Sequence, residues 1–453
     1  MDVRNKNILV IGMGKSGIAA AEVLLSLGAN VSVYDGKTPG EMEPHLIQYF
    51  KSRKATCFFG EEPKEVECFH LAVVSPGVPL TNKLVQRITS EGIELIGEVE
   101  LAYRLGRGNY VAITGTNGKT TTTVLTGEIF KQAGRPTEVV GNVGLAVVKK
   151  AVRATEDTWL ITEISSFQLE TTMDFHPHIS ALLNLTPDHL DRHSNMENYA
   201  RAKALVYRNQ TENDYFIVNR DDEECWKLAE ACPAKVVPFS RTRELDFGAF
   251  VKGGSIVICD EQGNQHRICR ALELGIPGAH NLENALAAAA IGFFTGIDPE
   301  SIGRTMESFQ GVAHRLEYVA EIQGVRFIND SKGTNIDASI KAIEAVEAPI
   351  ILIAGGYDKG ASFEPFIDAF NGKVKALVLL GRTAAKIKED AEKMGFNNII
   401  MAKNMEECVR ESFRIAEAGD TVLLSPACAS WDMYSNFEQR GNHFKSCVND
   451  LEK

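Results

Sequence analysis

Short apolar runs alternate with helix-like stretches along almost the whole chain. Examples of the apolar runs are NILVI at 7–11, WLIT at 159–162 and VKALVLL at 374–380. Runs of this length are typical of buried strands, and the stretches between them have the periodicity of helices. Strands that alternate with helices favour parallel sheets, so we predict an α/β fold.

The length of the chain indicates more than one domain. A single hydrophobic core rarely serves more than ~250–300 residues, and this chain has 453. Its apolar runs fall into three blocks, which predict α/β domains at residues 1–98, 99–311 and 312–453.

Composition and charge exclude several classes of protein. Hydrophobic residues make up 44% of the chain and charged residues 24%, which excludes general disorder. The net charge of −12 argues against a polynucleotide partner, and no apolar run is long enough to cross a membrane. The nine cysteines form no CxxC pair, which favours reduced thiols without a zinc or disulfide framework. The first residues enter a strand at once and do not resemble a signal peptide, so we expect a cytoplasmic protein.

The first glycine-rich motif lies near the start of the chain. Gly12, Gly14 and Gly17 follow the first apolar run, and Asp35 ends the next one, eighteen positions after Gly17. This is the dinucleotide fingerprint, with a tight turn, a close backbone approach to phosphate and a carboxylate for a ribose hydroxyl. On its own it favours an NAD-dependent oxidoreductase, although physically it predicts only a diphosphate or nucleotide at a helix N-terminus. A structural turn without a ligand is the other interpretation.

A second glycine-rich motif, GTNGKTT at 115–121, follows the strand-like VAIT. The strict phosphate-loop pattern fails because Ile113 stands where its first glycine should be. Its working parts remain, since the loop amides can surround phosphates, Lys119 can reach the β- and γ-phosphates and Thr120 can bind Mg²⁺. We therefore predict a nucleoside triphosphate in the second domain, and a dehydrogenase has no use for such a separate loop.

Three further residues of the second domain are candidates for a metal site. Glu163 ends an apolar run, where a carboxylate can hold a metal bound to the nucleotide. His189 lies in the polar segment DHLDRH after another strand, and it could equally be structural. Lys203 lies in an amphipathic stretch, so its pattern alone predicts a surface lysine.

Several segments occur in a fixed order along the chain. They are GTNGKTT, the strand that ends at Glu163, DHLDRH, HRLEY, INDSKGTN and SPACASWDMYSNFEQRGNHF. Together they resemble the Mur ligases, which form amide bonds at the expense of ATP in peptidoglycan precursor synthesis. The resemblance runs from the first strand to the last helix and is strongest for the members that add D-glutamate. It implies an N-terminal Rossmann-like domain, a central P-loop-type ATPase domain and a C-terminal Rossmann-like α/β domain.

The resemblance implies which residues bind the two nucleotides. The first domain would bind the UDP part of UDP-N-acetylmuramoyl-L-alanine through Gly14, Ser16, Gly17, Asp35, Lys37, Ser75 and Gly77. The second domain would bind ATP through Gly115, Thr116, Asn117, Gly118, Lys119, Thr120, Thr121, Asn281 and Asn284. The third domain would add Arg315 and Asp330 to the ATP site.

The resemblance also implies the residues at the reacting groups. Asn142 and His189 would face the carboxylate of the UDP substrate. Two Mg²⁺ ions would be held, one by Thr120 or Thr121 with Glu163, the other by His189 with a carbamylated Lys203. D-glutamate would be bound by Thr334, Lys359, Ser430 and Phe437. The catalytic set would be Lys119, Glu163, His189, Lys203 and Lys332.

The implied reaction has two steps, through an acyl phosphate. Since three domains contribute residues, we expect the active site between them and a closing motion of the third domain on ATP binding. We expect a monomer without nucleic-acid or membrane partners.

Three alternatives stay open at the level of the sequence. An NAD-dependent oxidoreductase rests only on the first glycine motif. A related ligase could add L-alanine, a diamino acid, a dipeptide or the glutamates of folate, although SPACASWDMYSNFEQRG favours D-glutamate and no Asn-Pro-Arg pattern occurs. A non-catalytic nucleotide-binding scaffold is the third alternative.

Overall fold

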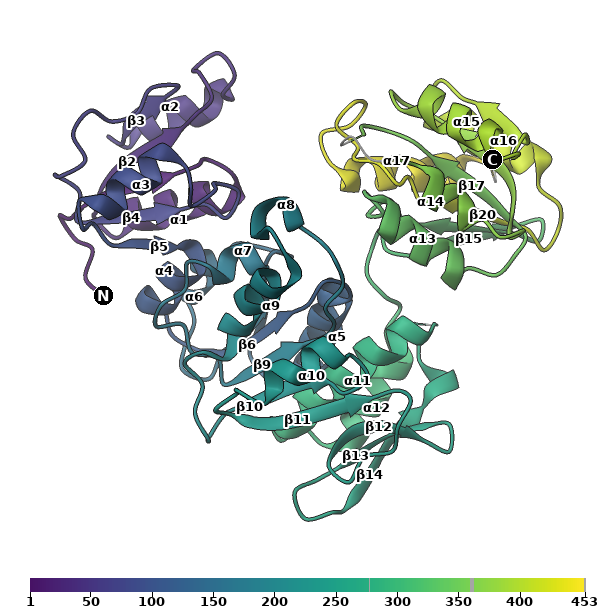
Figure 1. Cartoon of the computed structure of the whole chain (residues 1–453), viewed down its shortest axis with the longest axis horizontal. Coiled ribbons are helices and arrows are strands. Elements are labelled where there is room, and N and C mark those ends of the chain that lie inside the picture. Colours follow the sequence, from purple (N-terminus) through teal and green to yellow (C-terminus); the bar gives the residue numbers. More distant parts are fainter. Residues whose placement is uncertain (277, 359–361, 452–453) are drawn as a thin grey trace. The chain divides into compact units, whose positions relative to one another are not determined.

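The computed structural model describes residues 1–276, 278–358 and 362–451. In this part of the chain, three sheets covered by helices confirm the predicted α/β fold (Figure 1). Two compact units are present. The first consists of Met1–Gly275 and Ala279–Phe309 and holds two sheets, and the second consists of Ile276–Gly278 and Gln310–Lys453 and holds the third sheet.

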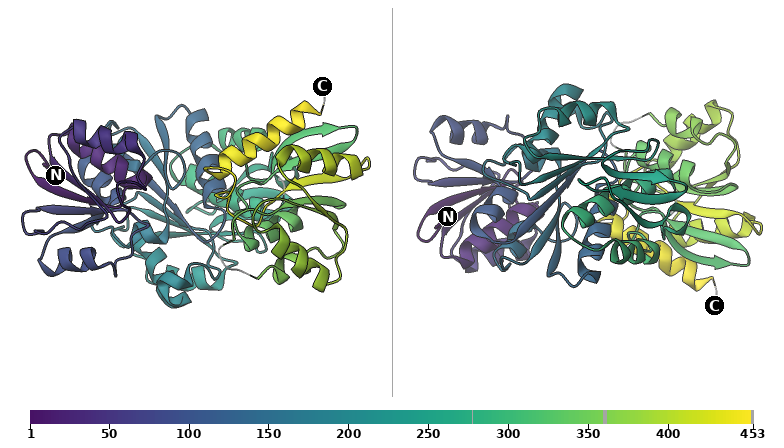
Figure 2. Two further views of the ribbon diagram at one scale, coloured as in Figure 1. Left: turned by 90° about the horizontal axis from the view of Figure 1, so that it is seen from above. Right: turned by 90° about the horizontal axis from the view of Figure 1, so that it is seen from below.

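The first sheet has five parallel strands in the order β3-β2-β1-β4-β5, with helices on both faces (Figure 2). The strands are β1 (Asn7–Ile11), β2 (Asn30–Asp35), β3 (Thr56–Phe59), β4 (Leu71–Val74) and β5 (Leu95–Gly97). The helices are α1 (Lys15–Ser26), α2 (Pro44–Ser52), α3 (Lys83–Ser90) and α4 (Glu98–Leu105). Successive side chains of β1 point to opposite faces of the sheet. Val10 packs in the core with α1, and Ile11 packs in the core with α3. Since β1 and β4 are neighbours, the loops that follow them meet at the carboxyl edge of the sheet.

The second sheet has nine strands in the order β14-β13-β12-β11-β10-β9-β6-β8-β7. Its strands are β6 (Asn109–Thr114), β7 (Thr137–Gly141), β8 (Trp159–Glu163), β9 (Ile179–Leu182), β10 (Tyr215–Asn219), β11 (Lys235–Ser240), β12 (Gly248–Lys252), β13 (Ser255–Cys259) and β14 (Gln265–Arg270). The strands from β12 to β7 run parallel, while β12, β13 and β14 pair antiparallel. Because β6 lies between β8 and β9 and runs parallel to both, the carboxyl ends of these three strands lie at the same edge of the sheet.

Helices and short 3₁₀ segments connect or follow these nine strands. They are α5 (Lys119–Gln132), α6 (Val147–Ala151), α7 (Ser166–Leu169), α8 (Leu190–His193), α9 (Met196–Ala204), η1 (Leu205–Tyr207), α10 (Glu223–Ala229), η2 (Ala271–Glu273), α11 (Ala279–Phe294) and α12 (Pro299–Ser308). The alanines of α11 are buried at 285 and 287–290, and α11 packs against α5. Small side chains permit this close packing of two helices, which sets α11 beside the loop that begins α5.

The third sheet, in the second unit, has six strands in the order β15-β16-β20-β17-β18-β19. They are β15 (Glu317–Ile322), β16 (Val325–Asn329), β17 (Ile350–Ala354), β18 (Val374–Leu379), β19 (Ile399–Met401) and β20 (Thr421–Leu424). The helices are α13 (Ile336–Ala345), α14 (Glu364–Asp368), α15 (Ala384–Lys393), α16 (Met405–Ile415) and α17 (Phe437–Asp450). Among the described strands of this sheet, only β15 runs antiparallel to its neighbour, so the loops after β16, β20 and β17 meet at one edge of the sheet.

Buried carboxylates of α4 join the two sheets of the first unit. Glu98 accepts a hydrogen bond from the backbone N–H of Val148, which lies in α6. Glu100 accepts three backbone N–H bonds from the segment 173–175, and Arg104 forms an ion pair with it at 2.7 Å. The domain boundaries near residues 98 and 311 stay predictions, but the first of them falls at the start of this helix.

The buried carboxyl of Glu98 is expected to make the free energy of unfolding depend on pH. Its Oε2 is buried and accepts no hydrogen bond from any described residue, and burial raises the pKa of this carboxyl to about 7. Between about pH 4.5 and 7 the unfolded chain therefore binds fewer protons than the folded one, so the free energy of unfolding falls as the pH rises. Across this pH range, we expect the free energy of unfolding of wild type to fall by up to roughly 3 kcal/mol more than that of Glu98→Gln. Urea unfolding at several pH values measures the difference.

The control for this measurement is Glu91→Gln, since Glu91 is exposed at the end of α3. This variant is expected to keep the wild-type pH dependence. An identical pH dependence in Glu98→Gln and wild type would contradict the assignment to Glu98.

No helix in the described ranges is both long and apolar enough to cross a bilayer.

Candidate active site

The glycine loop of the first sheet lies between β1 and α1 and has the geometry of a ligand-binding turn. Gly12 has a φ of +88°, and a Cβ there would lie 2.7 Å from the side chain of Val78. A Cβ on Gly17 would lie 1.8 Å from the carbonyl oxygen of Gly12. A Cβ on Gly14, at the N-terminus of α1, would meet no described atom within 4 Å. Gly12 and Gly17 are thus required by the backbone, whereas Gly14 leaves the helix N-terminus open to a ligand.

Asp35 and Ser75 hold this glycine loop in place. The Asp35 carboxylate accepts the backbone N–H groups of Met13 at 2.8 Å and Lys37 at 3.0 Å. The Ser75 hydroxyl is buried and donates to the carbonyl of Gly12 at 2.6 Å. Both residues therefore lie at the predicted UDP site, but a ligand would meet only their remaining oxygen lone pairs.

The other residues predicted to bind UDP surround the same edge. Ser16 is half-buried in the first turn of α1, and Lys37 and Gly77 are exposed on the loops after β2 and β4. These contacts stay predictions.

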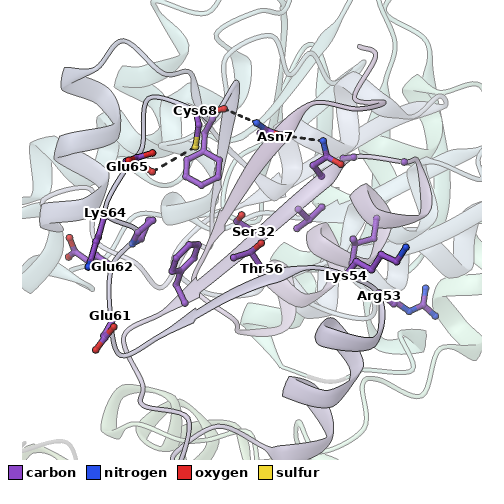
Figure 3. Close-up of a pocket in the computed structure, with 18 residues that line it drawn as sticks. Asn7, Ser32, Arg53, Lys54, Thr56, Glu61, Glu62, Lys64, Glu65 and Cys68 are labelled. Atoms are coloured by element: carbon purple, nitrogen blue, oxygen red, sulfur yellow. Dashed lines mark hydrogen bonds between the residues drawn. The ribbon is translucent and has the colours of Figure 1, made fainter.

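A cavity of about 730 Å³ lies at the other end of the first sheet (Figure 3). Its lining includes Asn7, Ser32 and Thr56 from β1, β2 and β3, with charged side chains of the 61–65 segment. Among the described residues, none of those predicted to bind UDP lines it. Ligands of open α/β sheets bind at the carboxyl ends of the strands, so we assign this cavity no part in the reaction.

The phosphate loop lies between β6 and α5, at the edge shared with β8 and β9. Gly118 has a φ of +80°, and a Cβ there would lie 2.1 Å from the amide oxygen of Asn284 in α11. Asn284 also accepts the hydroxyl of Thr122 and donates to Asn281. The structure thus sets Asn284 against the phosphate loop, while its predicted contact with adenine stays untested.

Two side chains that the sequence analysis did not single out fix the loop. The Asn184 amide accepts the backbone N–H of Asn117 at 2.7 Å and donates to its carbonyl at 3.1 Å. The Tyr199 hydroxyl lies 3.2 Å from that of Thr116. Asn184 is the second residue after β9, so its place after a strand was the signal that could have found it. Tyr199 lies on α9, where no local pattern marked it.

Two lysine amines converge on one carbonyl of the phosphate loop. Lys119 Nζ donates to Gly115 O at 2.8 Å and to Thr116 O at 2.7 Å. Lys203 Nζ donates to the same Gly115 O at 2.8 Å and lies over the Tyr199 ring. Lys203 is only 1% exposed, so the surface lysine expected from its pattern is wrong. Burial, and then repulsion by Lys119, hold the pKa of Lys203 well below its usual range.

Glu163 presents an unpartnered carboxylate oxygen beside the phosphate loop. It ends β8 and is 2% exposed, and its Oε1 accepts the amide of Asn142 at 3.0 Å. Within the described residues, Oε2 is buried and has no hydrogen-bond partner. A buried carboxylate oxygen left in this way fits a hard cation such as Mg²⁺. Thr120 and Thr121, the other predicted ligands, are buried in the first turn of α5.

The two histidines of the DHLDRH segment lie in different environments. His189 is exposed and has a φ of +53°. Its ring makes an edge contact with the Phe167 ring and lies 3.5 Å from Asp188. His193 is buried against Ser166, and burial lowers its pKa. Of the two histidines, only His189 is thus accessible to a ligand.

Arg192, which the sequence analysis did not single out, links the second sheet to the first. It donates to Glu170 and to the carbonyl of Pro76, which lies between the predicted UDP ligands Ser75 and Gly77. The loop after β4 is therefore tied to the segment that carries His189.

In the second unit, Asp330 is buried directly after β16. Its carboxylate accepts the hydroxyl of Ser425 at 2.7 Å and the backbone N–H of Leu316 at 3.3 Å. Burial raises the pKa of this carboxyl to about 7, and the nearby Arg315 opposes that rise. Arg315 Nε is buried and, in the part of the chain that the structure describes, has no hydrogen-bond acceptor. An unpartnered guanidinium nitrogen fits an anionic ligand.

Lys332 and Phe437 lie together beside Asp330. Lys332 Nζ lies 5.3 Å from the centre of the Phe437 ring, and the Phe437 carbonyl accepts the hydroxyl of Ser331. Thr334 follows in the same loop, and its N–H bonds to Lys332 O. The segment after β20 holds Ser430, which is buried. Lys359, the remaining predicted D-glutamate ligand, lies outside the described residues.

Arg440 is a central residue of this region that the sequence analysis did not single out. It is 2% exposed and donates to Ser331 Oγ, Ser331 O and Cys428 O. Burial lowers its pKa to about 10. Arg440 therefore ties α17 to the loops that carry Lys332 and Ser430. In the sequence, its presence in the segment FEQRG was the only feature that pointed to this residue.

Three Mur ligase domains match the chain in order. The MurD-like N-terminal domain of Mur ligases matches residues 6–97, and the Mur ligase middle domain matches residues 113–292. The Mur ligase glutamate ligase domain matches residues 314–428.

Relatives are similar over the whole chain. The UDP-N-acetylmuramoylalanine--D-glutamate ligase of Alkaliphilus oremlandii is 50% identical over 463 residues, with 100% of both chains covered. The proteins of the same name from Thermoanaerobacter sp. (strain X514) and Clostridioides difficile are 49% and 45% identical, again with 100% of both chains covered.

Solved structures share the fold at lower identity. The UDP-N-acetylmuramate-alanine ligase of Thermotoga maritima has a TM-score of 0.60 at 17% identity, covering 98% of this chain and 99% of its own. A pseudomurein peptide ligase type C from Methanothermus fervidus has a TM-score of 0.59 at 18% identity, covering 99% of this chain and 100% of its own.

These matches confirm the resemblance and the three-domain α/β fold, and they exclude the oxidoreductase alternative. The first glycine motif is thus part of a ligase fold. Because family domains and full-length relatives agree along its length, this chain belongs to the Mur ligase family.

Proposed function

We propose that this chain is an ATP-dependent ligase that joins D-glutamate to UDP-N-acetylmuramoyl-L-alanine in peptidoglycan precursor synthesis. The observation that carries the proposal is the full-length similarity, at 45–50% identity, to relatives named for these substrates. The second sheet supports the ATP-dependent part, because a phosphate loop and an unpartnered carboxylate oxygen lie at one edge.

The reaction would proceed through an acyl phosphate. A carboxylate oxygen of the UDP substrate attacks the γ-phosphorus of ATP, the bond to the bridging oxygen breaks, and ADP leaves. The amine of D-glutamate then attacks the acyl carbon, loses a proton and expels phosphate. Two anions meet in the first step, so charge neutralisation and positioning are the main demands on the protein.

Lys119 would neutralise charge on the transferred phosphate. The Gly115 and Thr116 carbonyls hold its ammonium over the loop, which supports a role at the β- and γ-phosphates. The N-terminus of α5 and the loop amides would orient the phosphates.

The residues present fit Mg²⁺, because the unpartnered oxygen of Glu163 is a hard ligand. We propose that Glu163 holds one ion with Thr120 or Thr121, and that His189 and Lys203 hold a second. When bound, Mg²⁺ supplies positive charge to the phosphate oxygens.

Lys203 would serve as a metal ligand only after carbamylation. An ammonium has three donors and no lone pair. The lowered pKa of Lys203 favours the neutral amine, whose nitrogen can attack CO₂. An N–C bond forms, a proton leaves and a carbamate with two oxygen ligands results.

The remaining assignments concern the other ligands. We propose that Gly14, Ser16, Gly17, Asp35, Lys37, Ser75 and Gly77 bind UDP, that Asn142 faces the substrate carboxylate, and that Asn281, Asn284, Arg315 and Asp330 contribute to ATP binding. Lys332, Thr334, Ser430 and Phe437 would serve D-glutamate. The buried, unpartnered Arg315 Nε supports an anion near Asp330. We also propose a cytoplasmic monomer without nucleic-acid or membrane partners, which the net charge of −12 supports for nucleic acid.

Amino-acid selectivity tests this function. Phosphate release from ATP with UDP-N-acetylmuramoyl-L-alanine is expected to be fastest with D-glutamate, compared with L-glutamate, L-alanine and meso-diaminopimelate. Fastest release with any other amino acid would overturn the D-glutamate assignment and leave the ligase class standing. No ATP turnover with any of the four would overturn the proposed function itself.

A further inference from the structure

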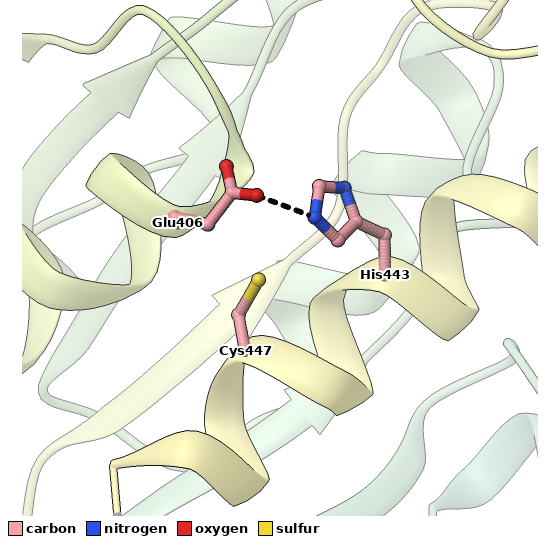
Figure 4. Close-up of side chains that lie close together, drawn as sticks. All are labelled: Glu406, His443 and Cys447. Carbon is pink, nitrogen blue, oxygen red and sulfur yellow. Dashed lines mark hydrogen bonds and ion pairs between the residues drawn. The ribbon is translucent and has the colours of Figure 1, made fainter.

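Three side chains of different chemistry converge between two helices of the second unit (Figure 4). Glu406 lies in the first turn of α16, while His443 and Cys447 lie one turn apart on α17. One carboxylate oxygen, one ring nitrogen and the sulfur all lie within 4.8 Å of one another. The absence of a CxxC pair led the sequence analysis to expect no zinc site, but these ligands come from segments 37 residues apart.

Both ring nitrogens of His443 have a polar partner. Its Nδ1 lies 2.9 Å from the Tyr434 hydroxyl, and its Nε2 lies 2.8 Å from Glu406 Oε1. A neutral imidazole carries one proton, so when Nδ1 donates to Tyr434, Nε2 turns a lone pair towards a carboxylate. A cation between these two atoms would satisfy both. Metal-binding histidines commonly donate their second nitrogen to such a partner.

We propose that Glu406, His443 and Cys447 bind a divalent cation of the zinc class. Zinc takes carboxylate oxygen, imidazole nitrogen and thiolate sulfur at about 2.0–2.3 Å, which sets tetrahedral ligands roughly 3.5 Å apart. The three atoms lie within 4.8 Å of one another, so adjustment of the side chains would bring them to this spacing. Thiolate is a poor ligand for Mg²⁺, so this site is chemically separate from the Mg²⁺ of the ligase reaction.

Binding would cross-link α16 to α17 and release a proton. A thiol binds a metal as the thiolate, so the S–H bond of Cys447 breaks as the sulfur–metal bond forms, and the proton passes to solvent. The ion would thereby fix α17, whose Arg440 holds the loops of Lys332 and Ser430. The site would therefore act by cross-linking the two helices, and none of its ligands belongs to the proposed catalytic set.

Cobalt titration of the full-length metal-free protein tests the site, because Co²⁺ bound to thiolate absorbs in the near ultraviolet. We expect a thiolate-to-cobalt band that saturates at one equivalent and disappears when Zn²⁺ is added. Cys447→Ser should abolish the band, and His443→Ala should weaken binding by more than about tenfold. Glu406→Gln should weaken it as well, and the exposure of Glu406 makes this change safe for folding. Cys68→Ser is the matched control, because Cys68 is an exposed cysteine far from this cluster in the sequence.

Two outcomes would overturn the proposal. One is the lack of a band at stoichiometric Co²⁺ in wild type. The other is a band that survives Cys447→Ser, or that is insensitive to both His443→Ala and Glu406→Gln. Neither outcome bears on the ligase function, which phosphate release measures separately.

Discussion

Lys119→Ala is expected to lower kcat by at least about 10²–10³-fold, the usual cost of removing one preorganised charge from a transition state. Lys119 Nζ is held at 2.7–2.8 Å by two loop carbonyls, so its charge is in place before phosphate transfer. The change should alter folding little, because the Gly115 carbonyl keeps its hydrogen bond from Lys203. Steady-state phosphate release gives kcat, and circular dichroism reports the fold.

The matched control is Lys131→Ala. Lys131 lies on the same helix α5, but it is exposed and forms an ion pair with Glu128 at 2.9 Å. This variant should retain wild-type kcat. A Lys119→Ala enzyme within a few-fold of wild type would refute the role proposed for the phosphate loop. A rise in the pKa of Lys203 should accompany the substitution, since Lys119 is one of the charges that lower it.

Lys203→Ala should abolish most activity, by about the same factor, if the carbamate holds a metal ion. Added bicarbonate should not restore this variant, because the amine that reacts with CO₂ is missing, whereas a short carboxylate such as acetate should restore part of its rate. Wild type incubated with ¹³C-bicarbonate should show a carbamate carbon by NMR, and Lys203→Ala should lack it. Lys203→Arg should also fail, since a guanidinium stays protonated and forms no carbamate.

Lys235→Ala is the control for these measurements. Lys235 also lies over a tyrosine ring, that of Tyr215, but it is exposed and paired with Glu261. It should keep both the activity and the carbamate signal of wild type. Full activity in Lys203→Ala would end the carbamate proposal, whatever the NMR spectrum shows.

Much of the fold could be read from local patterns. Strand-and-helix alternation predicted the α/β class. Gly12 and Gly118 marked turns with a positive φ, and Gly17 marked the close approach of α1 to the Gly12 carbonyl. The order of short motifs identified the family, because each motif is local and survives as a string of letters. The end of a strand also marked Glu163, since parallel strands bring their carboxyl ends to one edge.

The burial of the site residues and their hydrogen-bond partners could not be predicted from local sequence patterns. The amphipathic pattern around Lys203 gives helical faces, but it does not say that Gly115 and Tyr199 cover the face that carries this lysine. Likewise, nothing local shows that Asp35 serves the backbone of Met13. These environments are assembled from segments far apart in the chain.

The sequence by itself determined the α/β class, the glycine turns, the order of motifs and the family, because each of these is built from short patterns of residues that are neighbours in the chain. Only the tertiary structure decided that Lys119 and Lys203 share one carbonyl, that Glu163 keeps an unpartnered oxygen and that Arg440 is buried. The physical reason is that charge, desolvation and hydrogen-bond partners are set by whatever packs around a side chain, and that packing comes from distant segments.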